Sequence, residues 1–338
     1  MTSRAAAPPD ARHLVLVIGC TVRRDQTSLH GGPPAATPFL TQLAAEGARF
    51  DDLVTAAPWT RAASTAILTG HHPISVGMAD PSPRADTRVL PAAVTTLAEH
   101  LHEHGWRTVG LTTNPNLNAV YGFDQGFDVY RQPARLWREA SSRTEGARAV
   151  DEALGLVEAL PPSDAPLFLE VVLIDAHAPH VADGRERATF ADPDVPVEVV
   201  RYRAALRRLD DAVAKLEAGL RARGFGPDDT VFAFANDHGE GLRWPAHHGG
   251  SHGRTLAPSS VGGVFVARGP GVAPGTVIGG VASQLDLAPT LAALVGAPGL
   301  PAAGRDRSAE LAGRAAPAPA APVFTETWFK EVDRAAVY

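Results

Sequence analysis

The sequence predicts an α/β protein built around a mainly parallel sheet. Short apolar runs such as 14–18, 167–174 and 230–234 alternate with segments in which apolar residues recur every three or four positions. Runs that are apolar at nearly every position are typical of parallel strands buried on both faces, and their alternation with helices is typical of a sandwich with helices on both sides of the sheet. We therefore expect three layers: helices, sheet, helices.

The composition fits a globular protein with ample core and argues against nucleic-acid and membrane-spanning classes. The 338 residues are 45% hydrophobic and carry a formal net charge of −6. Lysine and arginine are not concentrated in a basic stripe, so no nucleic-acid partner is expected. No apolar stretch is long enough to cross a bilayer. Because Cys20 is the only cysteine, an intrachain disulfide is excluded.

The N-terminal part places a loop of interest directly after the first strand. Residues 1–12 are rich in Ala, Pro and Arg and are expected to be disordered. The strand 14–18 then leads into Cys20, and the loop after the first strand of a parallel sheet is a favoured ligand position. A cap residue with a first-turn proline predicts a helix over 37–47, and 49–54 is predicted to be a short strand.

The stretch 57–70 combines a hydroxyl with a helix start. A run of small, helix-compatible residues begins at Thr60 and is closed by Gly70. Backbone N–H groups at a helix N-terminus can hold a sulfate or phosphate, so Thr60 is a candidate for anion chemistry. The alternative is that Thr60 only caps the helix.

The rest of the chain continues the alternation. The expected helices are 94–105, 145–160, 202–220 and 283–294, and the expected strands are 108–112, 167–174, 230–234, 261–267 and 323–327. The polar stretch 181–197 is expected to be a surface excursion. We predict a main domain over 13–311, an Ala/Pro-rich linker over 312–322, and the start of a C-terminal segment over 323–338.

Two strands deliver titratable side chains where they end. The motif DAHAPH (175–180) follows one strand, and ANDHGE (235–240), with a histidine-dense loop over 247–252 beyond it, follows another. An adjacent carboxylate and imidazole in a glycine-flanked turn suit a divalent cation. Polar residues gathered at a strand's exit favour a functional His177 over a core histidine.

In their order, these stretches resemble the sulfatase branch of the alkaline-phosphatase superfamily over nearly the whole chain. The matching blocks are 19–25, 37–47, 58–70, 122–128, 175–180, 237–240, 252–256, 269–271 and 286–291. The resemblance implies an alkaline-phosphatase-like three-layer sandwich. It also implies a C-terminal subdomain that is truncated or missing here, because the sequence stops where that part begins.

The resemblance implies a metal-dependent hydrolase of phosphate or sulfate esters that works through a covalent intermediate. Thr60 stands at the nucleophile position, and Asp237 and His238 stand at metal positions. One divalent ion, Zn, Mn, Mg or Ca, is the implied cofactor. The implied partner is a small-molecule, glycan or lipid phosphate or sulfate ester.

The substrate side of the site is implied by the same blocks. His177 and His252 would contact the ester or its oxyanion and protonate the leaving group, and Arg254 would help to bind the substrate. Arg23 and Asp25 are expected to brace the first loop rather than to take part in chemistry.

The nucleophile segment departs from the family pattern. Sulfatases that use formylglycine carry Cys or Ser followed by x-Pro-x-Arg, whereas this chain has TRAAS over 60–64. Threonine cannot become formylglycine, so no formylglycine is expected. This favours a phosphate ester over a sulfate ester as the substrate. The alternative is a catalytically impaired relative, a pseudoenzyme that binds an anion or a partner.

The first metal position also departs, because Cys20 stands where the family has an aspartate. A thiolate there could be a ligand with a preference for zinc, or the side chain could be a small buried filler. If Cys20 is not a ligand, the site keeps only Asp237, His238 and Thr60, unless His247 or His248 compensates. A cytoplasmic location is expected for lack of a convincing signal peptide; the alternative is lipoprotein processing at Cys20, since 17–20 resembles a processing box.

Overall fold

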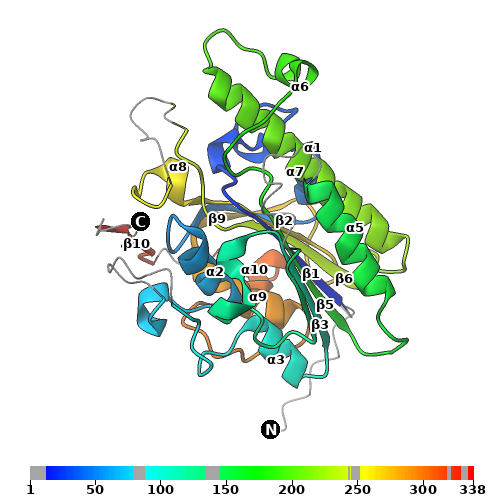
Figure 1. The fold of residues 1–338 in the computed structure, drawn as a ribbon. Coiled ribbons are helices and arrows are strands. Elements are labelled where there is room, and N and C mark those ends of the chain that lie inside the picture. The colour runs from blue at the N-terminus through cyan, green and yellow to red at the C-terminus, as the bar shows by residue number, and fades with distance from the viewer. Residues whose placement is uncertain are drawn as a thin grey trace.

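The computed structural model describes residues 13–78, 88–133, 145–242, 244, 252–317, 321–328 and 334–338. Within this part of the chain, a central sheet is covered by helices on both faces, which confirms the predicted three-layer α/β sandwich (Figure 1). The sheet has the strand order β4-β3-β5-β1-β6-β8-β2-β7, with β9 beside β2. The predicted disorder of 1–12 falls outside the described residues.

The centre of the sheet is a parallel trio. It consists of β5 (Leu167–Leu173), β1 (His13–Gly19) and β6 (Thr230–Asn236). The ends of the three strands are level, because Gly19 pairs with Leu173 on one side and with Asn236 on the other. The residues that follow these strands therefore emerge at one edge of the sheet, where ligands bind in open α/β sheets.

The flanks of the sheet differ from each other. On the β5 side, β3 (Arg107–Thr112) and β4 (Val129–Arg131) continue the parallel arrangement. On the β6 side lie β8 (Phe265–Arg268), β2 (Ala48–Val54), β7 (Gly262–Gly263) and β9 (Thr276–Ser283), of which β8 is antiparallel to both β6 and β2. The strand predicted over 261–267 was therefore wrong as one element, since it divides into β7 and β8. Neither β4 nor β9 was predicted.

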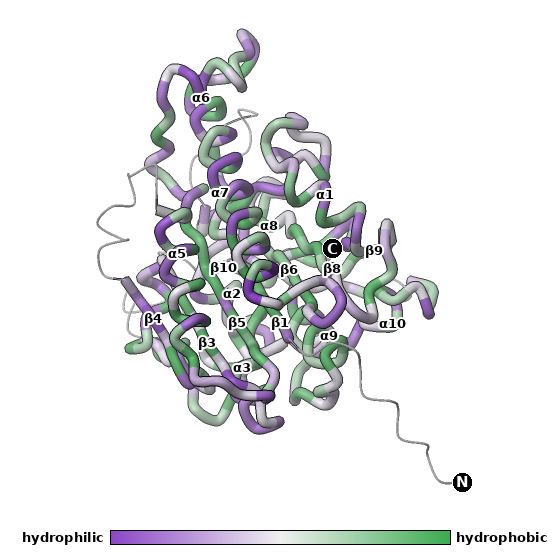
Figure 2. Tube along the Cα trace, turned by 90° about the vertical axis from the view of Figure 1, so that its right-hand side faces the viewer, coloured by the Kyte–Doolittle hydropathy of each residue, from purple (hydrophilic) through white to green (hydrophobic). Residues whose placement is uncertain are grey.

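Alternation along the strands divides the core into two layers. On β1, Leu14, Leu16 and Ile18 belong to one apolar cluster, whereas Val15 and Val17 belong to the other. The strands accordingly form an apolar interior in Figure 2. A strand that must bury both faces needs apolar residues at every position, which explains the unbroken runs in the sequence.

Helices cover both faces of the sheet. One face carries α1 (Pro38–Glu46), α5 (Glu145–Glu158) and α7 (Val197–Arg221); the other carries α2 (Thr60–Thr69), α3 (Leu97–Glu103), α9 (Leu287–Leu294) and α10 (Ser308–Leu311) (Figure 1). Short elements connect them: α6 (Gly184–Thr189), α8 (Pro258–Val261), η1 (Arg24–Gln26), η2 (Ser28–His30), η3 (Pro73–Val76), η5 (Pro115–Leu117), η6 (Ala119–Tyr121) and η8 (Gln284–Asp286). The excursion predicted over 181–197 contains α6, which a capping box from Asp183 begins. Among the described residues, no helix is both long and apolar enough to cross a membrane.

The C-terminal hairpin lies against loops that border the ligand edge of the sheet. It consists of β10 (Phe324–Thr327) and β11 (Arg334–Val337), which pair antiparallel. The backbone N–H of Glu326 donates to the carbonyl of Ala56 at 3.1 Å, and the Thr327 hydroxyl donates to the carbonyl of Gly253. The division of the chain at 312–322 stays a prediction.

Candidate active site

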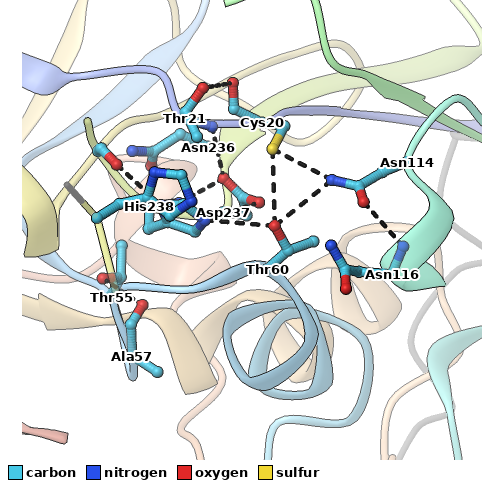
Figure 3. Close-up of polar contacts among 12 residues, drawn as sticks. Cys20, Thr21, Thr55, Ala57, Thr60, Asn114, Asn116, Asn236, Asp237 and His238 are labelled. Atoms are coloured by element: carbon cyan, nitrogen blue, oxygen red, sulfur yellow. Dashed lines mark hydrogen bonds and ion pairs between the residues drawn. The ribbon is translucent and has the colours of Figure 1, made fainter. Parts of the chain in front are cut away.

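Side chains from four segments meet where β1, β3 and β6 end (Figure 3). Cys20 follows β1, Asn114 follows β3, and Asp237 and His238 follow β6, while Thr60 is the first residue of α2. These residues are all buried. The level ends of the parallel strands bring the three strand exits together, and α2 supplies the hydroxyl from the adjacent layer.

The carboxylate of Asp237 has one anchored oxygen and one oxygen left for the site. Its Oδ1 accepts hydrogen bonds from the backbone N–H of Thr21 at 2.8 Å and of His238 at 2.6 Å. Its Oδ2 is buried and has no hydrogen-bond partner among the described residues. Because a buried carboxylate oxygen without a donor is costly, this atom is oriented for a ligand such as a cation.

The imidazole of His238 is held in one tautomer. Its Nδ1 lies 2.8 Å from the carbonyl oxygen of Gly239, which can only accept, so Nδ1 carries the proton. Burial lowers the pKa of His238, which keeps the ring neutral. The lone pair on Nε2 then faces the cluster, 3.4 Å from Asp237 Oδ2 and 3.3 Å from Thr60 Oγ1.

Thr60 is not a helix cap. Trp59 occupies the N-cap position of α2, and Thr60 is the first helical residue. The Thr60 hydroxyl oxygen lies 3.3 Å from His238 Nε2, 3.7 Å from Cys20 Sγ and 3.4 Å from the amide nitrogen of Asn114. The prediction that Thr60 only caps the helix is therefore wrong, because its hydroxyl contacts the side chains of the cluster and Trp59 is the cap residue.

Cys20 turns its sulfur into the same cluster. The side-chain amide of Asn114 donates to Cys20 Sγ at 3.2 Å, and the amide oxygen of Asn114 accepts from the backbone N–H of Asn116 at 2.9 Å. The second bond fixes the amide so that its NH₂ group faces the sulfur. Burial, together with the nearby Asp237 carboxylate, raises the pKa of the Cys20 thiol well above its ordinary value.

The donor atoms fit a divalent cation. Cys20 Sγ, a carboxylate oxygen of Asp237 and an imidazole nitrogen of His238 all lie within 4.8 Å of one another. Sulfur, nitrogen and oxygen donors at this spacing can share one ion. The cluster thus brings together Asp237 and His238, which the resemblance places at metal positions, and Cys20, which stands where the family has an aspartate.

The loop after β1 is held in a strained shape that aims Cys20. Thr21 has φ of 56°, the left-handed region that a non-glycine residue rarely adopts. The Tyr202 hydroxyl of α7 donates to the Thr21 carbonyl at 2.7 Å and accepts from the Arg23 N–H at 2.6 Å. The Arg23 guanidinium pairs with Asp25 at 2.6 Å within this loop, as a bracing role requires, and the exclusion of these two residues from the chemistry stays a prediction.

A second group of side chains borders the cluster. The His252 ring lies 4.9 Å from the His238 ring and 5.2 Å from the His177 ring, measured between centroids. His252 Nδ1 donates to Glu240 Oε1 at 2.9 Å, which fixes the ring orientation. Burial alone would raise the pKa of Glu240, but the hydrogen bond and positive charge of His252 lower it to about 2. Arg254 is exposed, and its role in substrate binding stays a prediction.

Asp175 and His180, the first and last residues of the DAHAPH motif, do not join the cluster. Asp175 Oδ1 accepts from the backbone N–H of Gly146 in α5, at 3.0 Å. His180 Nε2 lies 3.2 Å from the Ala176 carbonyl. His247 and His248 lie outside the described residues.

Sequence reasoning did not assign roles to Asn114, Glu240 or Gln284. Gln284 donates to the carbonyl of Asp237 at 2.8 Å and accepts from the N–H of Ala56 at 3.0 Å, which ties the exit of β6 to the loop before α2. The Thr-Asn-Pro turn after a predicted strand was the available signal for Asn114. Nothing in the local sequence indicates the long-range contacts of Gln284.

Fold and site together define a mainly parallel α/β sandwich with a cation-compatible cluster at the carboxyl ends of its strands. The sequence profile of the Sulfatase family matches residues 12–297, and the chain belongs to the sulfatase family. With this match, the predicted membership of the sulfatase branch is confirmed.

Curated relatives of similar sequence carry sulfatase names. N-acetylgalactosamine-6-sulfatase of Mus musculus is 26% identical over 340 residues, and arylsulfatase A of Homo sapiens is 28% identical over 354 residues. The matches cover 86% and 87% of this chain but 64% and 65% of those proteins. This chain therefore spans just under two thirds of the length of these relatives.

Solved structures share the fold at lower sequence identity. The phosphonate monoester hydrolase of Agrobacterium radiobacter superposes with a TM-score of 0.75 at 18% identity, over 94% of this chain and 80% of that chain. Ps i-CgsB in complex with k-i-k-neocarrahexaose gives a TM-score of 0.75 at 18% identity, over 97% of this chain and 82% of that chain.

Proposed function

We propose that this protein hydrolyses a phosphate or sulfate ester at a divalent cation, with Thr60 as the nucleophile. The observation that carries the proposal is the position of the Thr60 hydroxyl, 3.3 Å from His238 Nε2 and 3.7 Å from Cys20 Sγ. A hydroxyl inside a metal-compatible donor set is where a nucleophile for phosphoryl or sulfuryl transfer is required.

The cation would be held by Asp237, His238 and Cys20. When bound, a divalent ion supplies Lewis acidity that favours the deprotonated hydroxyl and neutralises charge developing on the ester oxygens. The oriented Oδ2 of Asp237 and Nε2 of His238 are the ligand atoms that support this assignment. The amide of Asn114 donates toward Thr60 Oγ1 at 3.4 Å, so it would orient the attacking oxygen.

The reaction would run in two displacements. Thr60 Oγ1 forms a bond to phosphorus or sulfur as its proton passes to solvent, and the bond to the leaving alcohol breaks. His252 or His177 gives that alcohol its proton. Water then attacks the threonine ester, which releases phosphate or sulfate and restores the Thr60 hydroxyl, and the histidine regains its proton from solvent.

The hydrogen-bonded pair of Glu240 and His252 supports the proposal that a histidine protonates the leaving alcohol. The Glu240 carboxylate accepts from His252 Nδ1, so it would hold the ring with its opposite nitrogen, Nε2, toward the substrate side. His177, with its ring 5.2 Å from that of His252, would complete the contact with the ester. Arg254, which is exposed, would add positive charge on the substrate side of the site.

A phosphate or phosphonate ester is favoured over a sulfate ester. Threonine at position 60 cannot be converted to formylglycine, and TRAAS lacks the proline and arginine that accompany that modification. A structural neighbour is named a phosphonate monoester hydrolase, whereas the curated relatives are named sulfatases. The substrate would be a small molecule, or a glycan or lipid that bears such an ester.

The test compares Thr60→Val with Ser64→Ala. Both remove a buried hydroxyl from α2, but Ser64 has no hydrogen-bond partner among the described residues. After loading with Zn, Mn, Mg or Ca, the protein is assayed on an aryl phosphate, a phosphodiester, a phosphonate and an aryl sulfate. We expect Thr60→Val to lose at least about 10³-fold in kcat, and Ser64→Ala to keep its activity. Absence of turnover with every ion and every ester would overturn the proposal.

The second candidate function is anion or partner binding without catalysis. Its observation is Cys20 in place of the family's aspartate, beside a nucleophile segment without proline and arginine. It predicts that the wild type binds phosphate or vanadate without turnover, and that Cys20→Asp gains metal and activity.

A further inference from the structure

We propose that the cation site is a zinc site in which the Cys20 thiolate is a ligand, so that the protein selects zinc over calcium and magnesium. The inference rests on the proposed function in placing a cation beside Thr60, but it concerns metal binding alone. It therefore stands or falls on measurements that do not require turnover.

The spacing of the donor atoms fits a tetrahedral ion. Zinc binds nitrogen and oxygen at about 2.0 Å and sulfur at about 2.3 Å, so neighbouring ligand atoms lie about 3.3 to about 3.5 Å apart. Around this cluster the separations are 3.4 Å from Asp237 Oδ2 to His238 Nε2, 3.3 Å from that nitrogen to Thr60 Oγ1, and 3.7 Å from Thr60 Oγ1 to Cys20 Sγ. Cys20 Sγ and the ligand atoms of Asp237 and His238 lie within 4.8 Å of one another, so the side chains would draw together around a bound ion.

Among the described residues, few side-chain oxygens face the cluster, so water would have to supply most of the ligands of calcium or magnesium. Calcium takes about six to eight oxygen ligands, and magnesium requires a near-octahedral oxygen shell. Of the two Asp237 oxygens, Oδ1 already accepts two backbone N–H bonds. Asn114 directs its oxygen to the N–H of Asn116 and presents donor N–H groups to the cluster instead. Among the described side chains here, Asp237 Oδ2 and Thr60 Oγ1 are the oxygens that face the cluster.

Without a cation, burial and the Asp237 carboxylate favour the neutral thiol, but the hydrogen bonds around the sulfur suit a thiolate ligand once a cation is bound. Asn114 Nδ2 donates to Cys20 Sγ at 3.2 Å, a bond that is strengthened when the sulfur is charged. His238 donates its other ring N–H to the Gly239 carbonyl, the outer-shell bond that accompanies zinc-bound histidines. On binding, the sulfur–hydrogen bond breaks, a sulfur–zinc bond forms, and the proton leaves to solvent.

The first measurement is metal competition. The full chain is stripped with chelator, dialysed against an equimolar mixture of zinc, manganese, magnesium and calcium, and analysed for elements. We expect about one zinc ion per chain and little of the other ions. Uptake of calcium or magnesium in preference to zinc overturns the proposal.

The second measurement is optical and identifies the ligand. Cobalt(II) replaces zinc, and a thiolate ligand gives an intense sulfur-to-cobalt charge-transfer band. Because Cys20 is the only cysteine, that band can come from no other residue of the chain. Cobalt bound without the band overturns the thiolate assignment, and this result needs no variant that might fail to fold.

Variants sharpen the assignment. Cys20→Asp should lose the cobalt band and move the preference toward manganese, magnesium or calcium, and Asn114→Ala should weaken zinc by about 10-fold to about 100-fold. Ser64→Ala, which keeps every proposed ligand, should bind zinc as the wild type does. Zinc binding without hydrolysis would overturn only the proposed function, whereas hydrolysis with magnesium or calcium and no affinity for zinc would overturn only this inference.

Discussion

Two buried carboxylates, one within the central sheet and one just beyond the end of a strand, have opposite surroundings. Asp237, immediately after β6, accepts two backbone N–H bonds on one oxygen and turns the other toward the cluster. Glu170, in the middle of β5, is 1% exposed, and neither of its oxygens has a hydrogen-bond partner among the described residues. Burial raises the pKa of Glu170 to about 8, so it is largely neutral at pH 7.

The difference follows from position along a strand. Glu170 pairs with Leu16 on β1 and with Gly110 on β3, so the backbone groups around it are committed to the parallel ladder. At the end of β6 the ladder stops, and the N–H groups of Thr21 and His238 are available to a carboxylate. A buried acid at a strand exit can therefore be stabilised by backbone N–H groups and keep one oxygen for a ligand, whereas in mid-strand it lowers stability.

The largest effect is expected from Asp237→Asn. The substitution keeps an acceptor for the two backbone N–H groups but removes the charge that a cation requires, so kcat/KM should fall by about 10³-fold or more. Zinc at about 100 times its Kd should stabilise the wild type by about 2.7 kcal/mol. Thermal unfolding with and without zinc should show that this gain disappears in the variant; an unchanged gain would mean that Asp237 is not a ligand.

The next effect concerns Glu170 and changes with pH. Its folded pKa lies above the ordinary value of 4.5, so the folded state holds an extra proton between about pH 5 and about pH 8. The free energy of unfolding should then fall as pH rises through this window, by about 1.4 kcal/mol per pH unit.

Glu170→Gln should remove that pH dependence, and Glu170→Leu should also raise stability at pH 8. Urea unfolding at several pH values measures both effects. Because Glu170 is placed outside the proposed machinery, both variants should keep ester hydrolysis. A wild-type stability that is constant from pH 5 to pH 8 would contradict the pKa argument.

A smaller effect is expected from Gln284→Ala. Gln284 is fully buried and bonds the carbonyls of Asn236 and Asp237 as well as the N–H of Ala56. Its removal leaves these groups unpaired and should cost about 1–3 kcal/mol of unfolding free energy. Activity should fall as well, since the exit of β6 loses its link to the loop before Thr60. Chemical denaturation and steady-state kinetics on the same preparation test the two parts.

The smallest effect should come from a carboxylate at the surface. Asp211 on α7 pairs with Arg207 at 2.8 Å, with 58% of the Asp211 side chain exposed. Water and salt screen such a pair, so Asp211→Asn should change stability by less than about 0.5 kcal/mol. A larger loss of unfolding free energy in denaturant titrations would show that burial does not explain the difference between Asp211 and the two buried acids.

Much of the fold was predictable because burial leaves a local pattern. The runs 14–18, 167–174 and 230–234 match β1, β5 and β6 closely, since strands covered on both faces cannot carry polar residues at regular intervals. β9 was missed because it has mixed burial and contains Gly279 and Gly280. β4 was missed because it has three residues, too few to show a period.

The candidate site was predictable in part. Asp237, His238 and Thr60 were grouped by the order of family motifs, and not by local spacing, because Thr60 and His238 are 178 residues apart. The contacts of Asn114 and Gln284 were not predicted. An isolated polar side chain has many environments open to it, and only long-range packing selects one.

The sequence by itself determined which elements form and which donor types are present: one thiol at position 20, a carboxylate and imidazole at 237 and 238, and a hydroxyl at 60. Only the tertiary structure decided how these groups face one another. It set the direction of Asp237 Oδ2, the tautomer of His238 and the side of Asn114 turned toward Cys20. The physical reason is that burial repeats along the chain, whereas the direction of a hydrogen bond depends on groups that distant segments bring into place.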